Sequence, residues 1–77
     1  SEDKTPISVP VLMEAFDEIA QAINDLDMDQ MDATIQKLDN YQFDEEGAKF
    51  YERLCEAVSD MDPDACEEVI SQWKDNL

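Results

Sequence analysis

A segment of 35 residues occurs twice in this chain. When the sequence is shifted by 35, residues 16–27 align with residues 51–62, and further on Ile35 falls opposite Ile70 and Leu38 opposite Trp73. A repeat of this length is typical of a helical hairpin, which cannot bury its apolar face alone. Two copies can close on each other. The repeat therefore predicts a small bundle of two hairpins, with Ile35 and Ile70 at equivalent positions in a shared core.

Apolar residues in both copies are spaced alternately three and four positions apart, which is the period of a helix that faces a core. We expect helices over residues 9–26 and 28–41, a third that begins after Asp44 and continues to Met61, and a fourth from Pro63 toward residue 77. Asp27, Asp44 and Asp62 are predicted N-caps. The core-facing residues are predicted to be Leu12, Phe16, Ile19, Ile23, Leu26, Met31, Ile35, Leu38, Tyr51, Leu54, Val58, Met61, Cys66, Val69, Ile70 and Trp73.

No alternation typical of a strand occurs, so the predicted fold class is all-α: a four-helix up-down-up-down bundle over residues 9–77. Residues 1–8 are predicted to be a flexible tail or the end of a linker. Phe43 lies in the central loop and is expected to close one end of the bundle. Trp73 is expected in the core; the alternative is that it marks a contact surface together with Met28, Met31 and Met61.

The chain is strongly acidic, with 21 acidic and 5 basic residues and a formal charge of -16. Binding to nucleic acid or to an anionic membrane needs clustered Lys and Arg, so neither partner is expected. The charge favours a protein partner with a basic surface, or serves only to keep the protein soluble. The sequence offers no apolar run long enough to span a membrane, and we expect a cytoplasmic location.

Residues that could carry chemistry are few. The chain has no histidine, the commonest catalytic base and metal ligand. We therefore predict no enzymatic activity, no catalytic residues, no metal site and no cofactor. Cys55 and Cys66 match apolar positions of the other copy and are expected to be reduced, although a disulfide between them remains an alternative.

Residues near the turns resemble parts of two known kinds of binding site. Asp25, Asp27 and Asp29, with their counterparts at 60, 62 and 64, resemble the start of a calcium loop, but Gly at its sixth position and Glu at its twelfth are missing. Helix capping explains these aspartates better. The size and acidity would also suit an acyl carrier protein. That function needs a serine preceded by aspartate, and none of Ser1, Ser8, Ser59 and Ser71 follows Asp.

The order of four stretches resembles a known domain. They are an apolar helix that ends at residues 25–29, residues 33–43, the acidic residues 44–46, and a second copy of the hairpin pattern that ends at residues 60–70. The domain they resemble is the C-terminal helical domain of some bacterial hybrid sensor histidine kinases, similar to a histidine-containing phosphotransfer (HPt) domain. Such a domain relays phosphoryl groups through a histidine on its second helix. Here that helix contains Thr34, Ile35, Gln36, Lys37 and Leu38, so no catalytic residue of the family can be transferred to this chain.

The resemblance implies a non-catalytic interaction or regulatory module of a two-component signalling protein. Such a module would dock onto a receiver or kinase domain without transferring phosphate. The alternative is a tetratricopeptide-like module that binds peptides, which the 35-residue period suggests. Against it, the Trp, Gly and Tyr signature of that repeat is missing, and two hairpins make a short groove.

Overall fold

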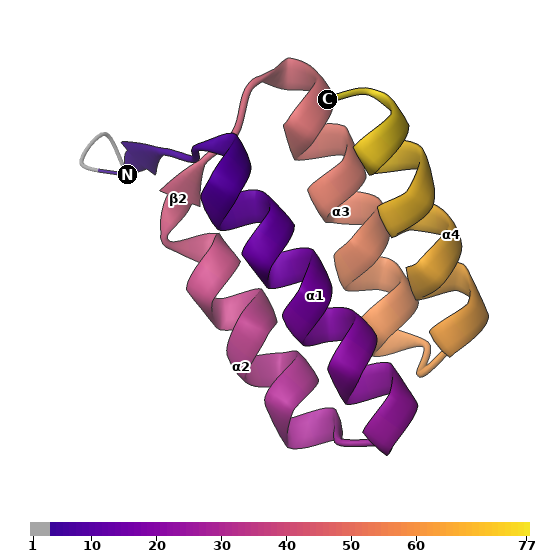
Figure 1. Ribbon diagram of the computed structural model, residues 1–77. Helices are drawn as coiled ribbons and strands as arrows, with labels where there is room; N and C mark the ends of the chain where they lie inside the picture. The colour runs from indigo at the N-terminus through magenta and orange to yellow at the C-terminus, as the bar shows by residue number, and fades with distance from the viewer. Residues whose placement is uncertain (1–3) are drawn as a thin grey trace.

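The computed structural model describes residues 4–77 and contains four α-helices. In chain order they are α1 (Val9–Asp25), α2 (Met28–Asp39), α3 (Glu45–Ser59) and α4 (Pro63–Asp75). Within each hairpin the two helices pack closely, and α1 also lies against α4 while α2 lies against α3 (Figure 1). The prediction of an all-α, four-helix up-down-up-down bundle of two hairpins is confirmed.

Aspartate residues are the N-caps of three of the helices. The carboxylates of Asp27, Asp44 and Asp62 each accept a hydrogen bond from the backbone N–H three residues later, as predicted. These bonds satisfy N–H groups that have no partner inside the helix. Pro63 occupies the first turn of α4, where its missing N–H costs nothing.

The expectation that the chain contains no strands is wrong. Two short strands, β1 (Thr5–Pro6) and β2 (Tyr41–Gln42), pair in parallel, and the N–H of Ile7 donates to the Gln42 carbonyl at 3.0 Å. Tyr41 therefore lies in a strand, beyond the end of α2, and not in the helix expected to extend to it. Residues 5–7 of the predicted tail lie alongside the central loop, and the Ile7 side chain packs against the core. Residues 1–3 of that tail lie outside the described part of the chain.

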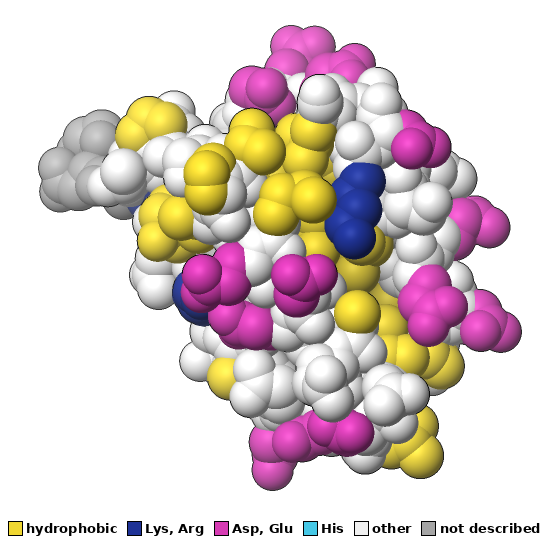
Figure 2. Space-filling model, in the orientation of Figure 1, with side chains coloured by type: hydrophobic (Ala, Val, Ile, Leu, Met, Phe, Trp, Pro, Cys, Tyr) yellow, Lys and Arg dark blue, Asp and Glu magenta, His cyan; other side chains and the backbone are white. Residues whose placement is uncertain are grey.

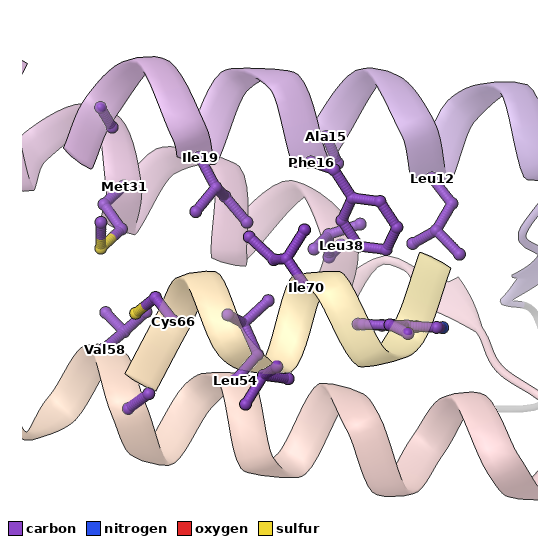
Figure 3. Packing of buried hydrophobic residues seen from close by; sticks show 14 residues of the cluster. Leu12, Ala15, Phe16, Ile19, Met31, Leu38, Leu54, Val58, Cys66 and Ile70 are labelled. Atoms are coloured by element: carbon purple, nitrogen blue, oxygen red, sulfur yellow. The ribbon is translucent and has the colours of Figure 1, made fainter. Parts of the chain in front are cut away.

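The core lies between the four helices along the whole bundle. Figure 3 shows Leu12 and Phe16 of α1, Leu54 of α3 and Ile70 of α4 pointing into the same interior. At one end, Trp73 packs against three phenylalanines, with ring centroids 5.1 Å from Phe16 and 5.7 Å from both Phe43 and Phe50. Phe43 thus closes this end of the bundle, as predicted, and Trp73 belongs to the core.

The two hairpins differ inside despite their repeat. Thr34 occupies the position of Val69 and is the one buried polar side chain in the described residues. Its hydroxyl lies 3.0 Å from the Gln30 carbonyl and 3.2 Å from Glu18 Oε1, and it donates to one of them at a time. Glu18 also accepts from Lys37 Nζ at 3.0 Å, and this hydrogen bond raises the pKa of Lys37. The first hairpin therefore buries a polar side chain that contacts both of its helices, at the position where the second hairpin buries the apolar Val69.

Candidate functional site

The two turns that join the helices of each hairpin have the same unusual backbone. Leu26 and Met61, at equivalent positions of the repeat, have φ angles of 54° and 55° and lie in the left-handed region. Leu26 directly follows α1 and Met61 lies two residues after the end of α3, each in a Schellman-type turn at a position usually taken by glycine. The closing backbone bonds run from Asp27 N–H to the Ala22 carbonyl (2.9 Å) and from Asp62 N–H to the Ala57 carbonyl (3.1 Å).

Leu26 and Met61 were predicted to face the core, and this prediction was wrong. Leu26 is 81% exposed and Met61 is 68% exposed. In each preceding helix the apolar side chains form a stripe that faces the core. The left-handed backbone at Leu26 and Met61 turns these two side chains away from that stripe. Both side chains are thereby presented to solvent at the end of the bundle where the two turns lie side by side.

An apolar groove lies between these turns, with a volume of about 260 Å³. We call it the turn groove. Cys66, Met31 and Val58 lie near one another at this end of the core (Figure 3), and Leu26 and Met61 are the exposed large hydrophobic side chains of the lining. The full lining consists of Ala22, Ile23, Leu26, Met28, Met31, Val58, Met61, Asp62, Pro63 and Cys66.

A second, shallower depression continues the turn groove along the seam between α2 and α3. It shares Met28, Val58 and Met61 with the turn groove and adds Ile35 and Cys55. Ile35 is only partly buried, whereas its repeat equivalent Ile70 belongs to the core, so the predicted equivalence of these positions is wrong. The two depressions together form one continuous apolar trough.

The surroundings of the turn groove carry one sign of charge. Asp25, Asp27 and Asp29 flank the first turn, and aspartates 60, 62 and 64 flank the second; all six are exposed. No Lys or Arg occurs in residues 5–36 or 54–73, which include both turns. Figure 2 shows exposed hydrophobic side chains at the lower right of the molecule with acidic side chains on either side. The groove is therefore an apolar surface in a negative potential.

The excess of carboxylates is expected to make the fold salt-dependent. Only two ion pairs are found in residues 4–77, both made by Lys37, so most carboxylates face like charges across water. We expect the melting temperature to rise by on the order of 5 °C between 20 and 200 mM NaCl, because salt screens repulsion between exposed charges. Calorimetry in the presence of EDTA measures this without divalent ions. A flat or falling melting temperature would contradict the prediction.

The left-handed turns predict an unusual gain of stability. Leu26→Gly and Met61→Gly are each expected to stabilise the fold by on the order of 0.5–1 kcal/mol, after the larger unfolded-state entropy of glycine is subtracted. Alanine is the matched control, because Leu26→Ala removes the same exposed side chain and keeps the Cβ that disfavours this backbone. Urea midpoints compare the variants. Equal midpoints for the Gly and Ala variants would show that the turns are not strained.

The remaining reactive groups offer little chemistry. Both cysteines are free thiols: Cys66 lies in the floor of the turn groove and Cys55 in the seam depression. Burial raises the pKa of each thiol, so both are protonated near neutral pH and are poor nucleophiles. Burial also raises the pKa of Tyr51, whose hydroxyl lies 3.1 Å from the Ile35 carbonyl and helps to hold α3 against α2.

The aspartates of the turns do not converge. In residues 4–77 no group of three or more Asp, Glu or Cys side chains lies close enough to hold a metal ion. Asp27 and Asp62 are engaged at the first turns of α2 and α4, in agreement with the capping interpretation of these runs. Within the same residues, no helix combines the length and the apolar character needed to cross a bilayer.

Sequence reasoning missed the most informative residues of this site. Leu26 and Met61 continue the helical spacing of their stripes, and that spacing alone assigns them to the core. A signal was nevertheless present, since each apolar residue stands between two aspartates in both copies: Asp-Leu-Asp and Asp-Met-Asp. Met28 and Met31 were named as possible contact residues together with Met61, and all three line the groove.

Comparison with known proteins does not assign this site, since no family model, no curated protein and no solved structure matches the chain.

Proposed function

We propose that this chain is a protein-interaction module that performs no chemistry of its own. The observation that carries the proposal is the turn groove, an apolar trough at an end of the bundle where every charged side chain is acidic. An exposed apolar surface rimmed by polar residues is typical of a protein-binding site. A negative potential around it speeds the encounter with a basic partner and selects against acidic ones.

In its narrower form, the proposal places the module in two-component signalling, as an HPt-like bundle that lacks the phosphoacceptor histidine. The four-helix plan and the resemblance described above support this form, and a cytoplasmic location belongs to it. The partner would be a receiver or kinase domain with a basic surface. The role would be regulatory, because binding occupies the partner without accepting its phosphoryl group.

Calorimetric titration with the receiver domain of a bacterial hybrid histidine kinase tests the narrower form. We expect saturable binding at 50 mM NaCl that weakens by about tenfold or more at 500 mM, because salt screens complementary charges. After incubation with the phosphorylated receiver, the mass of the chain is expected to be unchanged. Absence of binding at low salt, or a phosphorylated chain, would contradict the proposal.

The tetratricopeptide-like alternative receives less support from the helix arrangement. Successive repeats of a solenoid stack in the same orientation, so the first helices of neighbouring hairpins would touch. In this bundle α1 contacts α2 and α4, and α2 contacts α3. The hairpins close on each other, and no concave surface of stacked repeats is formed by residues 4–77.

A further inference from the structure

Leu26 and Met61 are large apolar side chains at positions where stability favours other residues. Glycine would adopt their left-handed backbone without steric cost, and asparagine would do so with a soluble side chain. Both turns nevertheless carry an exposed apolar residue on a disfavoured backbone. Strain of this kind is concentrated at sites that bind or react. The same departure at both turns, on the two sides of one groove, indicates that these side chains contact a ligand.

The negative charge around the groove indicates that the ligand is positively charged. Asp27 and Asp62 lie at the starts of α2 and α4, where the helix dipoles are positive, and their neighbouring aspartates are exposed. With no Lys or Arg in either turn, an acidic or phosphorylated ligand would be repelled. A ligand with Lys or Arg beside an apolar face would be attracted.

The shape and lining of the groove define the form of the ligand. Strand addition needs a free sheet edge, and the described strands lie beside the central loop, away from the turns (Figure 1). Proline-rich segments dock between aromatic side chains, and no aromatic residue lines the turn groove or the seam depression. An amphipathic helix needs an elongated apolar trough. Three methionines line this one, and their flexible side chains adapt to such a partner.

The volume of the groove also argues for a side-chain anchor. Pockets for small molecules and cofactors span roughly 300–1,000 Å³. The turn groove, at about 260 Å³, is smaller, and the seam depression into which it opens, at about 480 Å³, is shallow and open to solvent. It therefore suits one or two large apolar side chains of a longer ligand that continues along the seam between α2 and α3.

We propose that the turn groove binds a basic amphipathic helix of a partner protein. An apolar side chain of that helix enters the groove between Leu26 and Met61, further apolar residues follow the seam past Met28 and Ile35, and its Lys or Arg residues face the aspartates of the turns. This inference rests on the proposed function as an interaction module and adds its binding site and the chemical class of its ligand.

Three synthetic 18-residue peptides test the site by NMR titration of the labelled full chain. The first is a Lys/Leu peptide with its leucines on one helical face, the second has the same composition with the leucines distributed around the helix, and the third has Glu in place of Lys. We expect the first to shift the amide signals of both turns and of the seam between α2 and α3. The second is expected to bind about tenfold more weakly and the third not at all. Equal binding of the first two peptides would overturn the proposal, since charge alone would then explain it.

Variants distinguish the groove from the rest of the acidic surface. The double variant Leu26→Asn/Met61→Asn is expected to bind the first peptide at least about tenfold more weakly, while its melting temperature is retained. Met13→Gln is the matched control, because Met13 is exposed at 39% and lies outside both depressions, and it is expected to bind as the unmodified chain does. Unchanged binding by the double variant would overturn the proposal. So would a dimer of this chain that the double variant dissociates, because the groove would then hold a second copy.

The two proposals fail in different ways. If a receiver domain binds the double variant and the unmodified chain equally, the chain remains an interaction module and the groove assignment is wrong. If the first peptide binds in the groove and no receiver binds, the groove assignment holds and the signalling proposal is wrong.

Discussion

Replacing Ile70 with aspartate is expected to unfold the protein. Ile70 is 6% exposed and points from α4 into the interior that Phe16 and Leu54 also occupy (Figure 3). No Lys or Arg is buried in residues 4–77, so the carboxylate would be buried without a partner, at a cost of about 4 kcal/mol or more. A chain of 77 residues has a total stability of roughly 4–12 kcal/mol, and small domains lie toward the lower end. The substitution therefore removes most or all of the stability.

Circular dichroism at 25 °C and thermal melting measure this effect. Ile35→Asp is the matched control, because it makes the same change at the equivalent position of the other repeat. Ile35 is partly buried at the seam between α2 and α3, so its carboxylate can reach water. We expect the control to stay folded and to lose about 1–2 kcal/mol. The repeat by itself predicts equal effects for the two substitutions. If both variants unfold, Ile35 is buried as deeply as Ile70, and its assignment to the seam is wrong.

Replacing Trp73 with alanine is expected to give the second largest loss. The Trp73 ring is 2% exposed and contacts Phe16, Phe43 and Phe50, with ring centroids no more than 5.7 Å away. Truncating a buried aromatic residue of this kind costs about 3–5 kcal/mol, because it removes apolar contacts and leaves a cavity. The loss should also release Phe43, which closes this end of the bundle from the central loop.

Chemical unfolding in urea, followed by circular dichroism, measures the loss. Trp73→Phe is the control, since phenylalanine retains aromatic contacts with its neighbours and should cost less than the alanine variant, about 1–2 kcal/mol. Trp73 is the only tryptophan of the chain, so its own emission reports burial in the unmodified protein. Equal midpoints for the alanine and phenylalanine variants would show that the aromatic cluster does not hold this end together.

Much of the fold could be predicted from the sequence because its signals are local. The three- and four-residue spacing of apolar side chains places the helices, and the aspartates that cap α2, α3 and α4 act within one turn of chain. The strand pair could not be predicted this way. Thr5 and Tyr41 are far apart in the chain and pair through backbone groups, so no pattern of side chains in the sequence indicates that they pair.

The candidate site could be predicted only in part. Acidic turns and methionines near them are visible in the sequence, and they suggest a contact surface. The exposure of Leu26 and Met61 is not visible in the sequence. Both residues fit the helical spacing of apolar positions, but the backbone has already left the helical conformation there. A change in one φ angle reverses the direction of a side chain, and periodicity contains no information about it.

The sequence by itself determined the class of this protein: two amphipathic hairpins with an acidic surface and no histidine. These properties follow from composition and from interactions between residues close in the chain. Only the tertiary structure decided that Ile70 is buried while Ile35 is at the seam, and that two turns meet around one apolar groove. The physical reason is that burial depends on which distant segments come together, and this is a property of the packed chain.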